Sequence, residues 1–254
     1  MMDRQSIKEQ FGANAASYAV SKVHAKGASL ARLVALTAAQ PDWLVLDIAT
    51  AAGHTAFAFA PHVAHVWATD ITPEMLAVAE QQAQERGLKN ITVEYADAED
   101  LPYDAGKFDL VTCRIAPHHF VNVAPFMRES ARVLKPGGIL AIVDNVVPEG
   151  AAGDYVNAFE KFRDPSHGRC LSMDEWREAY AEAGLTLLQE DALDKEMPFE
   201  FWAKRHDATT VRYLRSMLSE VGGEAAAFLR PQFEKGKTTF YLREGIFIGQ
   251  KPVL

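Results

Sequence analysis

The sequence predicts an α/β protein with a mostly parallel sheet that is covered by helices on both faces. From residue 43 onward, apolar runs of strand length alternate with helix-length segments, an alternation typical of a parallel sheet. Polar residues follow or end several of these runs, namely Asp47, Asp70, Asp97 and Arg114. In an open parallel sheet, ligands bind outside the carboxyl ends of the strands. We therefore expect these four side chains to share one site.

The composition of the chain fits one globular domain, residues 1–254. Its 254 residues are 48% hydrophobic and 24% charged, which is ordinary for a globular protein and enough to bury a core. The net charge of −8 argues against a nucleic-acid partner, because phosphate contacts need clustered Lys and Arg. Two cysteines, Cys113 and Cys170, suit a reducing cytoplasm and give no disulfide framework.

No targeting or membrane segment is expected from the sequence. The first residues lack an apolar signal core, and no window approaches about 18 uncharged apolar residues. We expect a cytoplasmic protein without stable membrane insertion. The sequence leaves the oligomeric state open, with a homodimer as one alternative.

The elements up to residue 150 follow from periodicity and punctuation. Helices are expected over 4–11 and 15–39, where apolar residues recur at helical spacing, and Pro41 closes this section. Beyond it, strands are expected at 43–48, 64–69, 91–95, 108–113 and 138–144, and helices at 54–60, 73–86 and 122–134.

The pattern continues through the second half of the chain. The expected elements are helices at 153–162 and 172–183, strands at 185–191 and 239–248, and a helical insertion over about 198–235 between those strands. Ser172 and Glu175 form a capping box for the second helix. Gly184 is a suitable residue to end it.

The segment from Trp43 to Asp70 is suited to holding a nucleoside. One apolar run ends in Asp47, turns through small residues up to Gly53 and opens a helix, and a second run ends in Asp70, 23 residues after Asp47. Small residues let backbone approach a ligand closely, and the second acid can accept hydrogen bonds from ribose hydroxyls. A dinucleotide-binding turn carries three glycines. Because only Gly53 is present, a nicotinamide-linked oxidoreductase is disfavoured.

Five motifs occur in order between residues 40 and 145. They are Asp47 to Gly53, Asp70 to Leu76, Tyr95 to Pro102, Phe108 to Arg114 and Arg132 to Gly138. Together they resemble the motifs of class I S-adenosylmethionine-dependent methyltransferases. The chain looks most like the ubiquinone/menaquinone-biosynthesis branch of that family.

This resemblance implies a Rossmann-like, seven-stranded sheet whose last strand is antiparallel. It also implies an N-terminal helical lid over residues 1–40, a cofactor-binding core over 41–150 and the C-terminal half of the sheet over 151–254. In such proteins a helical insertion before the last strand helps to roof the substrate site.

S-adenosylmethionine is the cofactor that the resemblance implies. Motif positions suggest the cofactor-binding set Tyr18, Asp47, Ala49, Ala51, Gly53, Asp70, Ile71, Met75, Asp97, Ala98 and Arg114. Asp70 is expected at the ribose, with a helix cap before Pro73 as the alternative. Asp47 either orients the turn or meets the cofactor ammonium through water.

The remaining cofactor candidates also have two interpretations each. Asp97 and Ala98 are expected at the adenine, with an exposed acidic loop as the alternative. Met75 packs on the adenine face or belongs to the core. Tyr18 covers the cofactor from the lid or packs on an amphipathic helix.

The turn departs from the family pattern at Ala51 and Ala52, which are commonly glycine. If either position needs a left-handed backbone, alanine costs about 1 kcal/mol or more. The departure supports an alternative function, an S-adenosylmethionine- or S-adenosylhomocysteine-binding protein with impaired or no transferase activity.

The catalytic candidates are His118 and His119, of which one is expected to be structural. Transfer to oxygen or acidic carbon needs a proton acceptor, and His titrates near neutral pH. No metal is expected, because no further ligands have suitable spacing. The candidate substrate-binding residues are His24, Arg163 and His167. Arg163 and His167 either hold an anionic group or lie in a surface loop, and His24 either binds substrate or packs on a helix.

The leading interpretation is therefore a methyltransferase that methylates oxygen or carbon of a small or medium organic acceptor by in-line displacement. A hydrophobic roof would suit an aromatic acceptor; its expected members are Phe159, Phe162, Trp176, Trp202, Tyr213 and Phe240. RNA methylation is disfavoured, because the chain lacks a basic stripe.

Overall fold

A computed structural model describes Lys8, residues 11–12 and residues 27–253 of the chain. The strands are β1 (Leu44–Ile48), β2 (His65–Asp70), β3 (Ile91–Tyr95), β4 (Phe108–Arg114), β5 (Leu134–Val146), β6 (Thr186–Pro198), β7 (Gln232–Glu234) and β8 (Lys237–Gln250). Most of the helices expected before residue 28, and with them Tyr18 and His24, lie outside the described residues.

The helices fall between the strands as an α/β pattern requires. They are α4 (Ala28–Thr37), α5 (His54–Phe59), α6 (Pro73–Glu85), α7 (Val123–Val133), α8 (Gly150–Arg163), α9 (Met173–Glu182), α10 (Phe199–Trp202), α11 (Ala208–Glu220) and α12 (Gly223–Leu229). Single 3₁₀ turns, η1 (Ala60–His62) and η2 (Pro117–His119), follow α5 and β4. Ser172 and Glu175 form the expected capping box at the start of α9.

The sheet has the strand order β3-β2-β1-β4-β5-β8-β6, and β7 pairs with β8 outside this path. Neighbours among β1 to β5 are parallel, whereas β8 is antiparallel to β5, β6 and β7. The expected mostly parallel sheet with an antiparallel last strand is confirmed. The chain winds outward from β1 to β3 and then from β4 in the other direction, so the strand order reverses between β1 and β4. Ligands bind at such a switch point.

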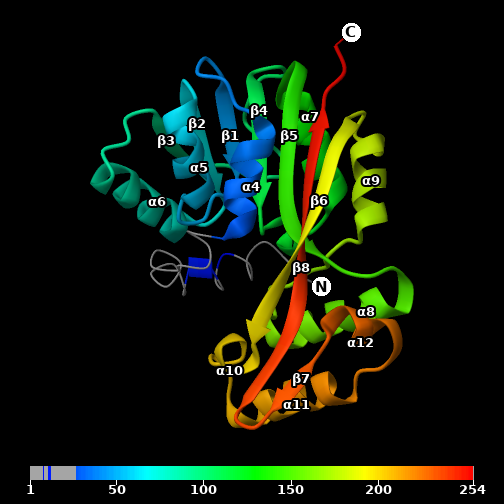
Figure 1. Ribbon diagram of the computed structural model, residues 1–254. Coiled ribbons are helices and arrows are strands. Elements are labelled where there is room, and N and C mark those ends of the chain that lie inside the picture. The colour runs from blue at the N-terminus through cyan, green and yellow to red at the C-terminus, as the bar shows by residue number, and fades with distance from the viewer. Residues whose placement is uncertain (1–7, 9–10, 13–26, 254) are drawn as a thin grey trace.

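Helices cover both faces of the sheet, as expected. On one face, residues of α4 and α5 such as Leu33 and Phe59 are fully buried against β1 and β2. On the other face, Phe126 of α7 and Trp176 and Tyr180 of α9 fill a second core. The arrangement of these layers can be followed in Figure 1.

The C-terminal half differs from expectation in the length of its strands. β6 continues to Pro198 and not to residue 191, and it pairs with β8 along nearly its whole length. The two strands leave the main sheet as a long antiparallel ribbon that carries α8, α10, α11 and α12 (Figure 1). Within the segment expected to be helical, Gln232–Glu234 forms the additional eighth strand β7. It exists because Gly236, at φ +80°, permits a tight turn into β8.

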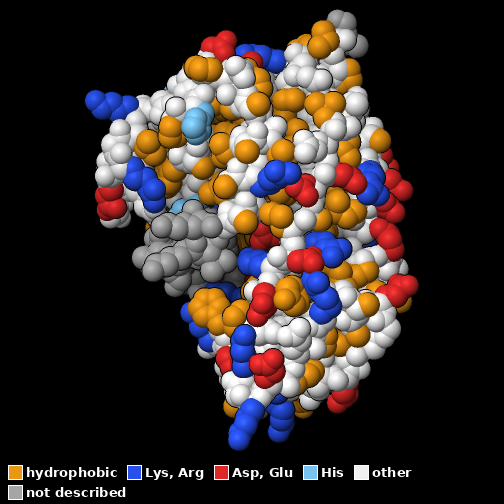
Figure 2. Space-filling view, in the orientation of Figure 1, with side chains coloured by type: hydrophobic (Ala, Val, Ile, Leu, Met, Phe, Trp, Pro, Cys, Tyr) orange, Lys and Arg blue, Asp and Glu red, His pale blue; other side chains and the backbone are white. Residues whose placement is uncertain are grey.

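The face of the molecule drawn in Figure 2 carries acidic, basic and apolar side chains interspersed with one another. Among the described residues, no helix combines the length and the apolar character that crossing a membrane requires.

Candidate active site

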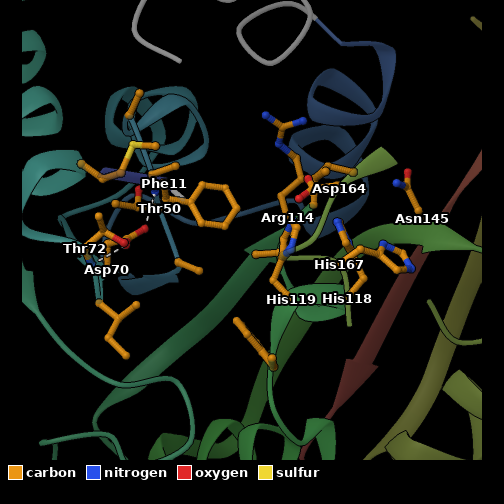
Figure 3. A pocket seen from close by; sticks show the side chains of 18 of the residues that line it. Phe11, Thr50, Asp70, Thr72, Arg114, His118, His119, Asn145, Asp164 and His167 are labelled. Carbon is orange, nitrogen blue, oxygen red and sulfur yellow. Dashed lines mark hydrogen bonds between the residues drawn. The ribbon is translucent and has the colours of Figure 1, made fainter. Parts of the chain in front are cut away.

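A cavity of about 490 Å³ opens at the carboxyl ends of β1, β2 and β4 and extends beneath α8 and α10. Twelve of the candidate cofactor-binding, catalytic and substrate-binding residues line it: Ala49, Ala51, Asp70, Ile71, Met75, Asp97, Ala98, Arg114, His118, His119, Arg163 and His167. In Figure 3 the ring of Phe11 lies between the Asp70 side and the histidine side of this cavity. The sheet thus brings together residues that are far apart in sequence, as expected for residues at the carboxyl ends of parallel strands.

The turn after β1 adopts the left-handed backbone that its glycine-like positions require. Ala49 and Ala51 have φ of 53° and 48°, and Gly53 has φ of 86°. The alanine penalty foreseen for this turn thus applies to Ala51 but not to Ala52. Gly53 is needed for a second reason, because a Cβ there would lie 2.3 Å from the ring of Phe57.

Asp47 lies behind this turn and braces it. Its two carboxylate oxygens accept hydrogen bonds from the hydroxyls of Thr50 (2.6 Å) and Thr112 (2.7 Å), and the residue is 1% exposed. Burial raises the pKa of Asp47 to about 6 against the opposing hydrogen bonds of both threonines. Of its two expected roles, this geometry matches orientation of the turn.

Asp70 joins the end of β2 to the turn after β1. One carboxylate oxygen accepts a hydrogen bond from the backbone N–H of Ala51 (2.9 Å) and the other from that of Thr72 (2.9 Å). Thr72, and not Asp70, is the N-cap residue of α6. Burial raises the pKa of Asp70, although these hydrogen bonds oppose it. The carboxylate is fixed at the cavity wall, and its remaining lone pairs can accept further hydrogen bonds.

The loop after β3 and the start of α6 complete this side of the cavity. Asp97 accepts a hydrogen bond from the backbone N–H of Glu99 (3.0 Å), which holds the loop in a turn. Met75 lines the cavity and is 1% exposed, so it belongs to the core and also contributes to the cavity wall. Together with Ile71 and Ala98 it gives an apolar wall next to acidic groups.

The end of β4 is locally strained. Ile115 has φ of 53°, a value rare for a β-branched residue, and its N–H donates to the carbonyl of Val143 (2.7 Å). Arg114 donates from Nε to the Thr55 hydroxyl (3.1 Å), while burial lowers the pKa of its guanidinium. Such outliers gather at functional sites, and this one turns the chain into the histidine pair.

His118 is paired with Asp144 of β5. The Asp144 carboxylate binds the ring Nδ1 of His118 (2.5 Å) and accepts from its backbone N–H (2.8 Å). Burial lowers the pKa of His118, but the charge and hydrogen bond of Asp144 outweigh burial, so the net pKa is raised. Asp144 therefore fixes the ring of His118 and favours its protonated form. The sequence analysis missed Asp144. This residue ends the apolar run 138–144, just as Asp47 and Asp70 end the apolar runs before them.

The pKa of His119 is shifted in the opposite direction to that of His118. Its Nδ1 lies 2.8 Å from the carbonyl oxygen of Ser166, which can only accept, so Nδ1 carries the hydrogen and Nε2 the lone pair. Burial and the neighbouring charge of His118 lower the pKa of His119 to about 3. The ring also meets that of Phe11 edge-on at 4.9 Å.

His167 is the third imidazole of the cluster, with its ring centroid 5.4 Å from that of His118. Its Nε2 lies 3.0 Å from Oδ1 of Asn157, and burial lowers its pKa to about 3. His167 is therefore buried and does not belong to an exposed loop. Among the described residues, no three His, Cys, Asp or Glu side chains are grouped to hold a metal ion.

The expected aromatic roof is only partly present. Trp202 lines the cavity, together with the unforeseen Phe201. Phe159 and Phe240 pack behind Trp202. Trp176 of α9 is buried in the core. Phe162 and Tyr213 line a separate surface groove. The roof is smaller than expected, because Phe162 of α8 and Tyr213 of α11 lie on helix faces that line the outer groove and not the cavity.

Comparisons with known proteins agree with this geometry. Residues 46–142 match the family described as "Methyltransferase domain". The uncharacterized methyltransferase YcgJ of Bacillus subtilis is 38% identical over 196 residues, which cover 77% of this chain and 78% of YcgJ. The crystal structure of YcgJ superposes with a TM-score of 0.84 at 33% identity, covering 88% of this chain and 98% of that one.

Two further matches extend the comparison. A solved structure from Bacillus halodurans superposes with a TM-score of 0.85 at 36% identity, covering 89% of this chain and all of that one. The ubiquinone/menaquinone biosynthesis C-methyltransferase UbiE of Agrobacterium fabrum is 34% identical over 108 residues, which cover 41% of this chain and 42% of UbiE.

Proposed function

We propose that this protein methylates oxygen or carbon of a small or medium organic acceptor. The proposal starts from the family, because the chain belongs to the class I S-adenosylmethionine-dependent methyltransferases. The observation that carries the proposal is Asp70. Its carboxylate is fixed by two backbone N–H groups at the cavity wall, next to the left-handed turn.

The residues of the Asp70 side fit the cofactor. Asp70 would accept hydrogen bonds from the ribose hydroxyls, and Asp97 from the exocyclic amine of adenine. Met75, Ile71 and Ala98 offer apolar contact to the purine. The turn of Ala49 to Gly53 offers backbone to the amino-acid end, with Asp47 holding its shape. When bound, S-adenosylmethionine supplies the electrophilic methyl group.

The two histidines have different proposed roles next to the acceptor. His119 is neutral, and the hydrogen bond from Nδ1 to Ser166 leaves the lone pair of Nε2 as a hydrogen-bond acceptor, while a pKa of about 3 makes His119 a weak base. His118 is bonded to Asp144, so it is a positioning residue that keeps the end of β4 in place. The apolar rings of Phe11 and Trp202 limit water in the cavity.

Isothermal titration of the purified protein tests the proposal directly. Saturable binding of S-adenosylmethionine and S-adenosylhomocysteine is expected, with no binding of NADH. Binding of neither adenosyl ligand would overturn the proposal. Formation of S-adenosylhomocysteine across a panel of phenols and hydroxy acids then separates an enzyme from a binding protein.

A further inference from the structure

The half of the cavity beyond the histidines is basic in an otherwise acidic protein. α8 contributes Arg163 to its wall and the turn after α10 contributes Lys204 and Arg205, beside the carboxylates of Glu160 and Asp164, whereas the chain as a whole has a net charge of −8. The wall also contains the apolar side chains of Met197, Phe201 and Trp202. Three cations beside an apolar surface are a binding arrangement for an amphipathic anion.

These three cations differ from other arginines of the C-terminal half. Five other arginines of that half are each paired with a carboxylate, in the pairs Arg169–Glu175, Arg177–Glu190, Arg215–Glu200, Arg230–Asp194 and Arg243–Asp194, whereas exposed Arg212 is not paired with any carboxylate of the described part of the chain. Within the described residues, Arg163, Lys204 and Arg205 form no salt bridge. Arg163 and Lys204 instead lie over aromatic rings, Trp202 at 5.2 Å and Phe201 at 4.3 Å.

The carboxylate next to Arg163 in sequence, that of Asp164, binds Ser166 through one oxygen, Oδ1, and, although burial opposes it, the charge of Arg163 helps to lower its pKa. Asp164 accepts hydrogen bonds from both the backbone N–H (2.9 Å) and the hydroxyl (2.6 Å) of Ser166. Arg163 is half-buried at the end of α8, with its guanidinium fork available at the cavity wall. A guanidinium in such a place can bind a carboxylate or phosphate by two parallel hydrogen bonds.

Glu160 lies one turn before Arg163, whose charge acts on it, and one of its carboxylate oxygens lacks a hydrogen-bond donor among the described residues. It lines the cavity and is 6% exposed, and its Oε1 has no hydrogen-bond partner in the described structure. A buried acceptor left without a donor costs about 1–3 kcal/mol. A ligand hydroxyl or amine would satisfy this atom, so Glu160 also points to a ligand.

We infer that the acceptor is an organic acid with an apolar body and a hydroxyl or amine hydrogen. Its carboxylate or phosphate binds Arg163, with Lys204 and Arg205 at the rim, and its hydroxyl or amine donates to Glu160. The inference deepens the proposed function and rests on it, because it names the acceptor class of the same cavity.

Three matched probes separate the two contacts. 4-Hydroxyphenylacetate carries both groups, 4-hydroxyphenylacetamide lacks the charge, and phenylacetate lacks the hydroxyl. Isothermal titration is done with the full chain, with and without saturating S-adenosylhomocysteine. Each lost contact is expected to weaken binding about tenfold, since hydrogen bonds to charged groups are among the strong ones.

Variants then assign each contact to its residue. Arg163→Gln is expected to remove the preference for the acid over the amide. Glu160→Gln is expected to reduce the preference for the hydroxyl, because its amide oxygen is an uncharged and weaker acceptor. Arg212→Gln is the matched control, because exposed Arg212 also lies over a ring, that of Tyr213, outside this cavity. Glu178→Gln, at an exposed position of α9, is the control for Glu160.

Equal affinity for acid and amide, or failure of the acid to bind, would overturn the inference, as would equal effects of Arg163→Gln and Arg212→Gln. If S-adenosylhomocysteine itself does not bind, the proposed function fails instead. The titrations without S-adenosylhomocysteine still test the probe site in that case.

Discussion

The carboxylate of Asp70 accepts a hydrogen bond from the backbone N–H of Ala51 at 2.9 Å. This bond joins the end of β2 to the turn after β1 through Ala51 and Asp70, which are 19 residues apart in sequence. Because Ala51 has a left-handed backbone, the hydrogen bond compensates for part of the strain of the turn. The cofactor site and the local stability of the turn therefore depend on one side chain.

Asp70→Ala is expected to weaken S-adenosylhomocysteine binding at least about tenfold while the protein remains folded. The variant removes the acceptor for ribose and leaves two backbone N–H groups without their partner, and hydrogen bonds to charged groups contribute about 1.5–3 kcal/mol. Titration calorimetry measures affinity, and circular dichroism checks folding. Asp42→Ala, at an exposed acid, is the control, and unchanged affinity in Asp70→Ala would contradict the assignment.

Ala51→Gly is expected to leave the free energy of unfolding unchanged or to raise it by up to about 1.5 kcal/mol. Glycine removes a left-handed penalty of about 1–2 kcal/mol but adds unfolded-state entropy worth about 0.5–1 kcal/mol. Ala52→Gly gains no such relief, because Ala52 does not have a positive φ, and it should destabilise. Urea unfolding of both variants gives the comparison, and equal destabilisation would refute the strain argument.

Asp144→Asn is expected to lower the pKa of His118 below its ordinary value, because burial remains while the carboxylate charge is lost. In the unaltered protein, the raised pKa of His118 contributes stability that is fully present below its ordinary value of 6.5. That contribution is lost as pH rises through the raised pKa. Titration of the imidazole signals by nuclear magnetic resonance tests this, and an unchanged His118 pKa in the variant would contradict the pairing.

His119 and His167 are expected to make unfolding easier in acid. With pKa values lowered to about 3, they stay neutral in the folded protein between about pH 3 and 6.5, where the unfolded chain binds protons. Stability therefore falls as pH decreases through this window, by up to about 1.4 kcal/mol per pH unit for each histidine.

Urea unfolding at several pH values checks this dependence. His119→Gln and His167→Gln should each flatten the curve of unfolding free energy against pH, while His62→Gln, at an exposed residue, should leave it unchanged. Parallel curves for all three variants would disprove the histidine contribution.

The expectation that ligands bind at the carboxyl ends of parallel strands predicted much of this site. What it missed has physical causes. It located Asp47 and Asp70, but it could not show that Asp47 turns to Thr50 and Thr112 while Asp70 reaches the cavity. Asp144 carries the same signal and was overlooked, and its partner His118 is 26 residues away. Which atoms pair depends on the register between β4 and β5, which periodicity does not report.

The sequence by itself determined the alternation of strands and helices, the order of the sheet motifs and the family, because these depend on local apolar pattern and motif spacing. The tertiary structure alone decided the shape of the acceptor half. The extended ribbon of β6 and β8 brings α8 and α10 over the cavity, and this packing selects which helix faces are buried. Glu160, Arg163 and Trp202 face the cavity for that reason, whereas Phe162 and Tyr213 line an outer groove.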